Sequence, residues 1–360
     1  MNKDYFLPTI SIVAPTYNVE KYVGQFLSTV LNQTFQDFEL IIIDDCSTDN
    51  SVAIVESFIP KFNGRLHLVK RNTNSGGDAI PKNTGIKLSR GKYLFILDSD
   101  DLITKTALEE LYNIAEETQA DVLHAEKFLI PKDRSDNIDK NTKFIIDTWE
   151  QGGFVKNVEI ETNNLAERMD LYIKRRFAWY HWNKFFRRDF ILENDITLPN
   201  LPASSDLIFS FCCLCLAKKY VRIPNVFNIY RPNPDSMTRK NLSNEKYLKK
   251  WITILVEGIK IMDDFMDSIN FFIKKPEYKY KVIDFYIQEV FNWTNKVYPN
   301  ISIYKIDEIL RKEFSCHLTN SLPTISYLFN ISNIYRIRLS QSQFQIRQLQ
   351  QQITNLQQKN

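Results

Sequence analysis

The sequence lacks a long apolar run and an excess of charge of one sign. Its longest apolar stretch, LIFSFCCLCLA at 207–217, is much shorter than the roughly 20 residues of a membrane-spanning helix. The first residues, MNKDYFLPTI, contain no apolar core of a secretory signal peptide. The 46 Lys and Arg residues against 43 Asp and Glu give a formal net charge of +3, so no overall nucleic-acid footprint is present. We expect a cytoplasmic protein with no nucleic-acid partner, and peripheral contact with the inner face of the cytoplasmic membrane stays open.

Glycine-rich phosphate loops and a metal-binding cysteine pattern are also missing. No G-x-G-x-x-G follows the first apolar run, which argues against a dinucleotide oxidoreductase, and no G-x-x-x-x-G-K-[ST] indicates a P-loop enzyme. The five cysteines are odd in number, and Cys212, Cys213 and Cys215 crowd one apolar segment. Because no second cluster stands at metal-ligand spacing, we expect buried free thiols in a reducing compartment.

The first 125 residues contain short apolar runs that alternate with amphipathic stretches. With 360 residues and 44% hydrophobic content the chain can bury a sizeable core in two or three units. The alternation predicts an α/β fold with a mostly parallel sheet, whose ligands bind outside the carboxyl ends of the strands. The predicted strands are 11–15, 38–44, 65–71 and 92–98, and the predicted helices are 20–32, 50–58, 78–89 and 104–118.

Polar motifs follow three of the four predicted strands, and the last is the most acidic. In "DSDD" the carboxylates Asp98, Asp100 and Asp101 would repel one another, and a divalent cation would remove this cost. Such hard oxygen donors suit Mg²⁺ or Mn²⁺ together with substrate phosphates. Alternatively, these residues only cap the helix that begins near Thr104. The second acidic motif, at 44–49, favours the metal interpretation.

These motifs together carry a resemblance to a known family. The ordered series P-T-Y-N, D-D-x-S-x-D, N-x-G…K-N-x-G and D-S-D-D, over residues 9–125, resembles the inverting nucleotide-sugar glycosyltransferases of family 2. The resemblance implies the GT-A fold, a Rossmann-like, mostly parallel sheet flanked by helices. It also implies Mn²⁺ or Mg²⁺, a nucleoside diphosphate sugar donor, most readily a UDP-sugar, and a carbohydrate or lipid-linked glycan acceptor. The implied product is a bacterial surface glycan such as capsule or lipooligosaccharide.

The resemblance assigns the nucleoside site to the first two motifs. It implies that Pro15, Thr16 and Tyr17 line the pocket for the base and ribose. It also implies that Asp45, or its neighbour Asp44, accepts a hydrogen bond from the base. Uracil has an N–H that suits this acceptor.

The family roles for the diphosphate and the metal fall on four other positions. Lys82, where the family usually has Arg, would reach the base or diphosphate, unless it is a solvated helix lysine. Asp98 would bind ribose or assist the metal, and Asp100 would be the main metal ligand. Arg231, in the loop "YRPNPDSMTR", would pair with diphosphate charge, unless it is only a surface arginine.

The resemblance places the acceptor side in the middle of the chain. "HWNKFF" at 181–186 matches the family segment W-x-K-[LF]-[FY], so Trp182 and Lys184 would bind the acceptor, although Trp182 could equally be a core residue. Asp206, in "LPASSDLIF", stands where the family has its general base. Ser205 replaces the usual preceding Glu. The alternative is that Asp206 caps the helix that follows.

The domain organisation predicted from these motifs has three parts. Residues 1–240 would form the catalytic domain, with a nucleotide-sugar half at 1–125 and an acceptor half at 126–240. A helical region at 241–330 and a coiled-coil-like tail at 331–360 would follow. The tail predicts a homo-oligomer, and its abrupt end suggests truncation from a longer protein. The alternatives to an enzyme of this family are a catalytically silent glycan-binding or scaffold module and a nucleotidyltransferase, against which the missing glycine-rich loop argues.

Overall fold

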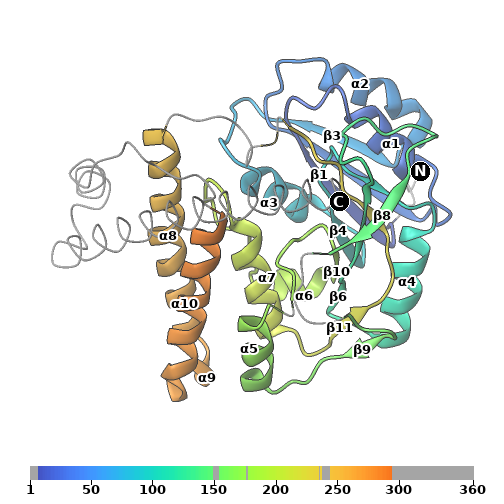
Figure 1. The fold of residues 1–360 in the computed structure, drawn as a ribbon. Coiled ribbons are helices and arrows are strands. Elements are labelled where there is room, and N and C mark those ends of the chain that lie inside the picture. Colours follow the sequence, from blue (N-terminus) through green and yellow to red (C-terminus); the bar gives the residue numbers. More distant parts are fainter. Residues whose placement is uncertain (1–6, 149–153, 176, 235, 237–243, 294–360) are drawn as a thin grey trace, which may run out of the picture. The chain divides into compact units, whose positions relative to one another are not determined.

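The computed structural model describes residues 7–148, 154–175, 177–234, 236 and 244–293 (Figure 1). Two compact units are formed, the first from residues 1–240 and 258–285, the second from 241–257 and 286–360. The predicted tail at 331–360, and the oligomer contact predicted for it, lie outside the described residues. The predicted domain boundaries stay predictions.

An eight-stranded mixed sheet forms the centre of the first unit. In spatial order its strands are β3 (Leu66–Lys70), β2 (Phe38–Asp44), β1 (Ile10–Thr16), β4 (Tyr93–Ile96), β10 (Lys184–Arg187), β6 (Val122–Ala125), β11 (Tyr220–Ile223) and β9 (Glu159–Ile160). Strands β3, β2, β1 and β4 are parallel to one another. Strand β10 is antiparallel to both β4 and β6, so the predicted parallel half is joined to the second half by a strand of opposite direction. The predicted α/β fold with a mostly parallel sheet is confirmed.

A smaller sheet connects the acidic motif to the loop that contains Arg231. Its strands, in spatial order, are β5 (Leu102–Ile103), β12 (Asn228–Ile229), β7 (Phe128–Pro131) and β8 (Phe144–Asp147). Strand β5 starts directly after Asp101 and pairs with β12, which ends two residues before Arg231. Two segments far apart in the sequence are therefore held together beside the end of β4.

The helices of the first 125 residues lie where the sequence predicts them, each starting one to three residues later. These are α1 (Val23–Leu31), α2 (Ser51–Phe58), α3 (Ala79–Leu88) and α4 (Ala107–Thr118), with the 3₁₀ helix η1 (Ile59–Phe62) directly after α2. The later helices of the described residues are α5 (Leu165–Ile173), α6 (Arg188–Glu193), α7 (Ser205–Leu216), α8 (Asn244–Asp267), α9 (Asn270–Lys274) and α10 (Pro276–Trp293). Within the described part of the chain, none of them has the length and apolar character needed to cross a membrane.

Helix α3 packs closely on β1 because a glycine stands at the contact. Side chains alternate across a strand, so Ile12 and Ala14 join the core that contains Phe26 of α1, whereas Val13 points the other way. A Cβ atom on Gly85 of α3 would lie 2.3 Å from Val13 Cγ1. This close approach brings α3, and Lys82 on it, near the ends of β1 and β4.

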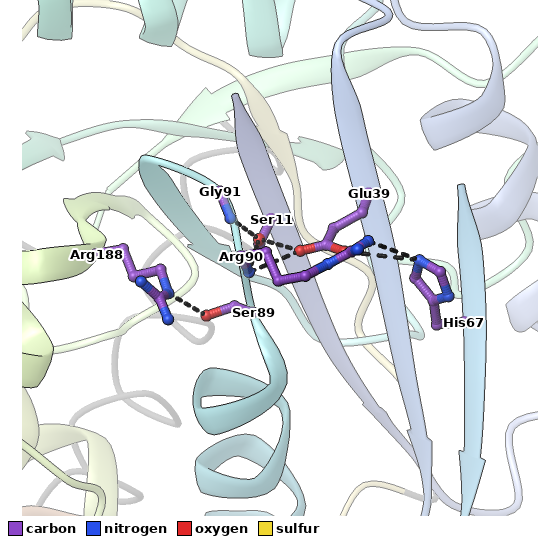
Figure 2. A network of polar contacts seen from close by, with 7 residues as sticks. All are labelled: Ser11, Glu39, His67, Ser89, Arg90, Gly91 and Arg188. Carbon is purple, nitrogen blue, oxygen red and sulfur yellow. Dashed lines mark hydrogen bonds and ion pairs between the residues drawn. The ribbon is translucent and has the colours of Figure 1, made fainter. Parts of the chain in front are cut away.

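A buried polar network fixes the connection from α3 to β4 at the amino edge of the sheet (Figure 2). The Glu39 side chain, 2% exposed, accepts hydrogen bonds from Ser11 Oγ at 2.7 Å and from Arg90 N at 2.8 Å and Nη2 at 2.6 Å. Gly91 N donates to Ser11 Oγ at 2.8 Å, and His67 Nε2 lies 3.6 Å from Glu39 Oε2. A buried carboxylate is tolerated when it is paired and hydrogen-bonded in this way. The network therefore anchors Arg90 and Gly91, in the α3–β4 connection, to β1 and β2.

Candidate active site

The three polar motifs predicted from the sequence meet at the carboxyl edge of β1, β2 and β4. Thr16 and Asp44 are paired residues at the ends of two neighbouring strands, and Asp45 N donates to Thr16 O at 2.9 Å. Ser99 Oγ, within the DSDD motif, donates to Pro15 O at 2.7 Å. These bonds join the first motif to the other two, as the parallel topology predicts.

Lys82 and Asp98 form the centre of this edge. Lys82 Nζ lies 2.5 Å from Asp78 Oδ2, one turn earlier on the helix, and 3.2 Å from Asp98 Oδ1. Burial opposes the charge of Lys82, but the two carboxylates outweigh burial and raise its pKa. Burial likewise opposes ionisation of Asp98, yet its contacts with Lys82 and His181 hold the pKa of this carboxyl well below its usual range. The pair is therefore ionised at neutral pH.

Asp206 faces the same charges from the other half of the sequence. It lies in the first turn of α7, where Ser204, with φ of +64°, is the residue that precedes the helix. Burial raises the pKa of Asp206 to about 6; His181 and Lys82 oppose this rise, and Asp78 and Asp98 add to it. A carboxylate with a pKa near the working pH is suited to accept a proton. The N-cap position of α7 is Ser204, and Asp206, two residues later, accepts a hydrogen bond at Oδ1 from Leu207 N at 3.0 Å.

Asp100 and Asp101 contact the loop after β12. Asp100 Oδ2 accepts a hydrogen bond from Asn233 Nδ2 at 2.8 Å, and Asp101 Oδ1 accepts one from Arg231 N at 2.7 Å. Burial, followed by repulsion between the carboxylates of the DSDD motif, raises the pKa of Asp100 and of Asp101. A cation would relieve this repulsion, so the donor set fits a hard divalent ion.

The protein side chains alone do not complete a metal site. Among the described residues, no group of three or more His, Cys, Asp or Glu side chains is arranged to hold a metal ion. A cation bound by Asp100 and Asp98 would therefore need further oxygen ligands from water or from a phosphate-bearing substrate, as is common for Mg²⁺.

The residues predicted to bind the base differ in whether their side-chain oxygens already have hydrogen-bond partners. Asp45 Oδ2 accepts from Ser75 N at 2.9 Å and Ser75 Oγ at 2.7 Å, and Asp45 Oδ1 pairs with Arg71 Nε at 2.9 Å. Asp44 Oδ1 and Thr16 Oγ1 are buried and have no hydrogen-bond partner among the described residues. Asp45 thus closes the segment 71–75 against β2, and Asp44 keeps an oxygen available.

Comparisons with known proteins decide the family. The model of the family "Glycosyl transferase family 2" matches residues 11–188, which contain the edge motifs and the segment through β10. The chain belongs to glycosyl transferase family 2. It is 42% identical over 116 residues to the poly(ribitol-phosphate) β-N-acetylglucosaminyltransferase TarP of Staphylococcus aureus strain N315, which is 32% of this chain and 35% of TarP. It is 32% identical over 213 residues to the poly(ribitol-phosphate) β-glucosyltransferase of Bacillus spizizenii, which is 58% of this chain and 30% of that protein.

A solved structure has the same fold. The structure of S. aureus TarS 1-349 in complex with UDP-GlcNAc matches with a TM-score of 0.63 and 21% identity, covering 94% of this chain and 91% of that one. At this identity the likeness concerns the fold alone, and it confirms the predicted sheet flanked by helices. The chain spans about one third of the length of TarP and of the Bacillus glucosyltransferase, and 63% of the uncharacterized glycosyltransferase EpsJ of Bacillus subtilis.

Three residues to which the family resemblance gives ligand-binding roles have other contacts in this structure. Arg231 Nη2 donates to Gln25 Oε1 at 2.6 Å, and its guanidinium carbon lies 5.0 Å from the centre of the Tyr22 ring. Lys184 Nζ, with its residue 0% exposed, donates to the carbonyl oxygens of Ala178 and Tyr180. These cations thus hold loops of the protein in place instead of presenting free charge at a surface.

Trp182 is the third of these residues. Its ring stacks between Tyr180 and Tyr230, with centroids 5.2 and 5.9 Å away, and it meets Phe128 edge-on. Trp182 is buried and belongs to the core cluster that includes Phe128. The core interpretation of this tryptophan is the one that the structure favours.

Several side chains that complete the site were not predicted from the sequence. His181, Asp78, Arg71, Ser75 and Asn233 contact predicted site residues, but none was singled out. Asp78 could have been found from its spacing, since it stands four residues before Lys82 in a predicted helix. The other four carried no such signal, because their partners come from different elements.

Proposed function

We propose that this protein is an inverting glycosyltransferase that moves a sugar from a UDP-sugar to a hydroxyl group of a bacterial surface glycan. The observation that carries the proposal is the position of Asp206 in the first turn of α7, where it interacts electrostatically with His181, Lys82 and Asp98, and where burial raises its pKa to about 6. Family membership supports glycosyl transfer as the reaction class.

Asp206 acts as the general base. It takes the proton of the acceptor hydroxyl as that oxygen attacks the anomeric carbon of the donor sugar. The bond between the anomeric carbon and the diphosphate oxygen breaks on the opposite side, and UDP leaves with the electron pair. One displacement of this kind inverts the anomeric configuration, and no covalent enzyme intermediate is formed.

The donor site lies over the ends of β1 and β2. Tyr17 is 39% exposed at the end of β1, where its ring offers a surface for stacking the base beside Pro15 and Thr16. Asp44, with a buried unpartnered oxygen, and Asp45, with its carboxylate on Ser75 and Arg71, are the two candidate acceptors for a base N–H. The UDP and UDP-GlcNAc complexes of TarS, which has the same fold, support a uridine nucleotide.

A divalent cation, Mn²⁺ or Mg²⁺, completes the proposal. Asp100 and Asp98 would hold it, and it would supply positive charge to the departing diphosphate. The protein's own contribution is to keep the two carboxylates in place, Asp98 through Lys82 and Asp100 through Asn233.

For the acceptor we propose a phosphate-containing wall polymer or a related surface glycan. Two relatives act on poly(ribitol-phosphate) by their names, and poly(ribitol-phosphate) is therefore the first acceptor to test. A cytoplasmic location with peripheral contact at the inner membrane face is part of the same proposal.

The test uses the full chain with a panel of UDP-sugars, with and without poly(ribitol-phosphate), and measures UDP release and product formation. We expect UDP release with one UDP-sugar to rise on adding acceptor, and NMR of the product to show an inverted anomeric centre. Glycan binding without turnover by any donor would instead identify a catalytically silent module with this fold.

A further inference from the structure

The surroundings of Lys82 account for all three of its hydrogen-bond donors. Lys82 is 0% exposed, and its Nζ lies 2.5 Å from Asp78 Oδ2, 3.2 Å from Asp98 Oδ1 and 3.5 Å from His181 Nδ1. An ammonium group has three N–H bonds and no lone pair, so these three acceptors match its donors one to one. Lys82 then has no donor left for a diphosphate, and its effect on substrate must pass through its neighbours.

The same contacts determine which nitrogen of the His181 ring carries the proton. Since Nδ1 faces an ammonium, it can only accept, and the ring proton then sits on Nε2. His181 is 2% exposed, and Nε2 has no aligned hydrogen-bond partner among the described residues. It lies 3.3 Å from Asp98 Oδ1, so a small rotation of either side chain forms an N–H···O bond between them.

We infer that His181 is a positioning residue, which accepts from Lys82 at Nδ1, donates from Nε2 to Asp98, and thereby fixes the Asp98 carboxylate beside Asp206. The inference deepens the proposed function of this site and rests on it for its kinetic part. Its structural part, the hydrogen-bond state of the ring, can be measured without any turnover.

Lys82 and His181 are matched to each other, in the sense that the size and the donors of one suit the acceptor and the space that the other provides. An arginine would not fit the same surroundings, because a guanidinium carries five N–H bonds in a planar fork and is larger than an ammonium. The enclosed space around Lys82 offers three acceptors, one of them supplied by His181. An arginine at position 82 therefore requires a different residue at position 181.

The first test replaces each ring nitrogen separately. His181→Gln keeps a donor near the position of Nε2, His181→Asn keeps an acceptor near Nδ1, and His181→Phe removes both. We expect His181→Phe to lower kcat by about 10- to 100-fold, the range found when residues that orient metal ligands are removed. UDP affinity should stay near the wild type, and Gln and Asn should each restore part of kcat. The melting temperature of His181→Phe should fall, because the phenyl ring leaves one N–H of the buried Lys82 ammonium without its acceptor.

A matched control is available at the other edge of the sheet. His67 also lies between a cation and a carboxylate, 3.4 Å from Arg90 Nη2 and 3.6 Å from Glu39 Oε2 (Figure 2), but it is far more exposed than His181. His67→Phe should leave kcat unchanged. A wild-type kcat in folded His181→Phe would overturn the positioning role.

The second test does not depend on activity. The ¹⁵N NMR signals of the chain's four histidines report which ring nitrogen carries the proton, and the signals lost in His181→Gln identify this residue. We expect the Nε2–H form, and an Nδ1–H form would overturn the inference even if the protein is an active transferase. If no donor is turned over but the Nε2–H form is found, the proposed function fails and the hydrogen-bond assignment stands.

The third test addresses the pair. Lys82→Arg alone should lower the melting temperature, and the double variant Lys82→Arg, His181→Ala should recover most of the loss because the ring no longer occupies the space. Equal melting temperatures of the single variant and the wild type would show that the two residues are not matched.

Discussion

Lys82 Nζ lies 3.2 Å from Asp98 Oδ1, which joins the helix after the third strand to the acidic motif after the fourth. The lysine is enclosed, so its charge serves to hold this carboxylate ionised and in place. Because Asp206 faces the same two groups, one ion pair organises both halves of the site.

The close packing of α3 on β1 can be tested with two helical glycines. Gly85→Ala would put a Cβ 2.3 Å from Val13 Cγ1, and overpacking of this kind typically costs about 1–3 kcal/mol of unfolding free energy. Gly24→Ala is the control, since its Cβ would meet Ile54 Cγ2 at an ordinary 3.6 Å, and it should be neutral or stabilising. Denaturant unfolding measures both. Equal stability of the two variants would contradict the packing described here.

Asp45 should matter for nucleotide binding even without metal. Asp45→Ala removes a charged acceptor, a loss typically worth about 1.5–3 kcal/mol, or roughly 10- to 100-fold in UDP affinity by calorimetry. Ser75→Ala leaves the carboxylate but removes the hydroxyl that binds it, so it separates a direct contact from loop ordering. Unchanged UDP affinity in Asp45→Ala would move the base contact to Asp44.

Asp100 should carry the metal dependence. Asp100→Ala is expected to abolish stimulation of turnover by Mn²⁺ and to weaken UDP binding only when Mn²⁺ is present. Asn233→Ala is the control, because it removes the amide that bonds Asp100 and leaves the carboxylate. Full wild-type activity in excess EDTA would rule out the metal role.

Much of the fold could be predicted because short local patterns of apolar and polar residues indicate its strands and helices. The apolar run FELIIID predicts a strand with the limits that β2 has in the structure. The order of the motifs predicts that Asp44 and Asp98 lie at the carboxyl edge of the sheet. Strand β10 was not predictable in this way, because the antiparallel pairing of Phe185 with Phe95 depends on partners distant in the sequence.

Site residues could be predicted where a sequence motif contains them. The role of a residue could not be predicted where it depends on how the side chain packs. Asp206 was predicted from its position in a motif; in the structure it interacts electrostatically with Lys82 and Asp98, and its role as the base stays a prediction. Lys184 and Arg231 looked like ligand-binding cations, but burial directs one to backbone carbonyls and the other to Gln25. Charge in a sequence does not reveal whether the side chain will be enclosed.

The raised pKa of Asp206 predicts how rate and stability change with pH. The base must be ionised, so the rate of transfer should rise as pH increases through about 6 and then level off. The pKa lies above its ordinary value of 3.8, so the folded state binds this proton more tightly than the unfolded state, and stability falls as pH rises across that window. Asp206→Asn should therefore melt no lower than the wild type at pH 8. A pH–rate profile that is flat between pH 5 and 8 would contradict the assignment.

The most direct measurement is the transfer rate of Asp206→Asn with a saturating UDP-sugar. The substitution keeps the shape of the side chain and removes the carboxylate that accepts the proton. General base catalysis typically contributes about 10²- to 10⁴-fold, so we predict a loss in this range, with UDP affinity and melting temperature close to the wild type. Transfer at a near wild-type rate would contradict the role of Asp206 and place the base elsewhere, with Asp101 the next carboxylate to test.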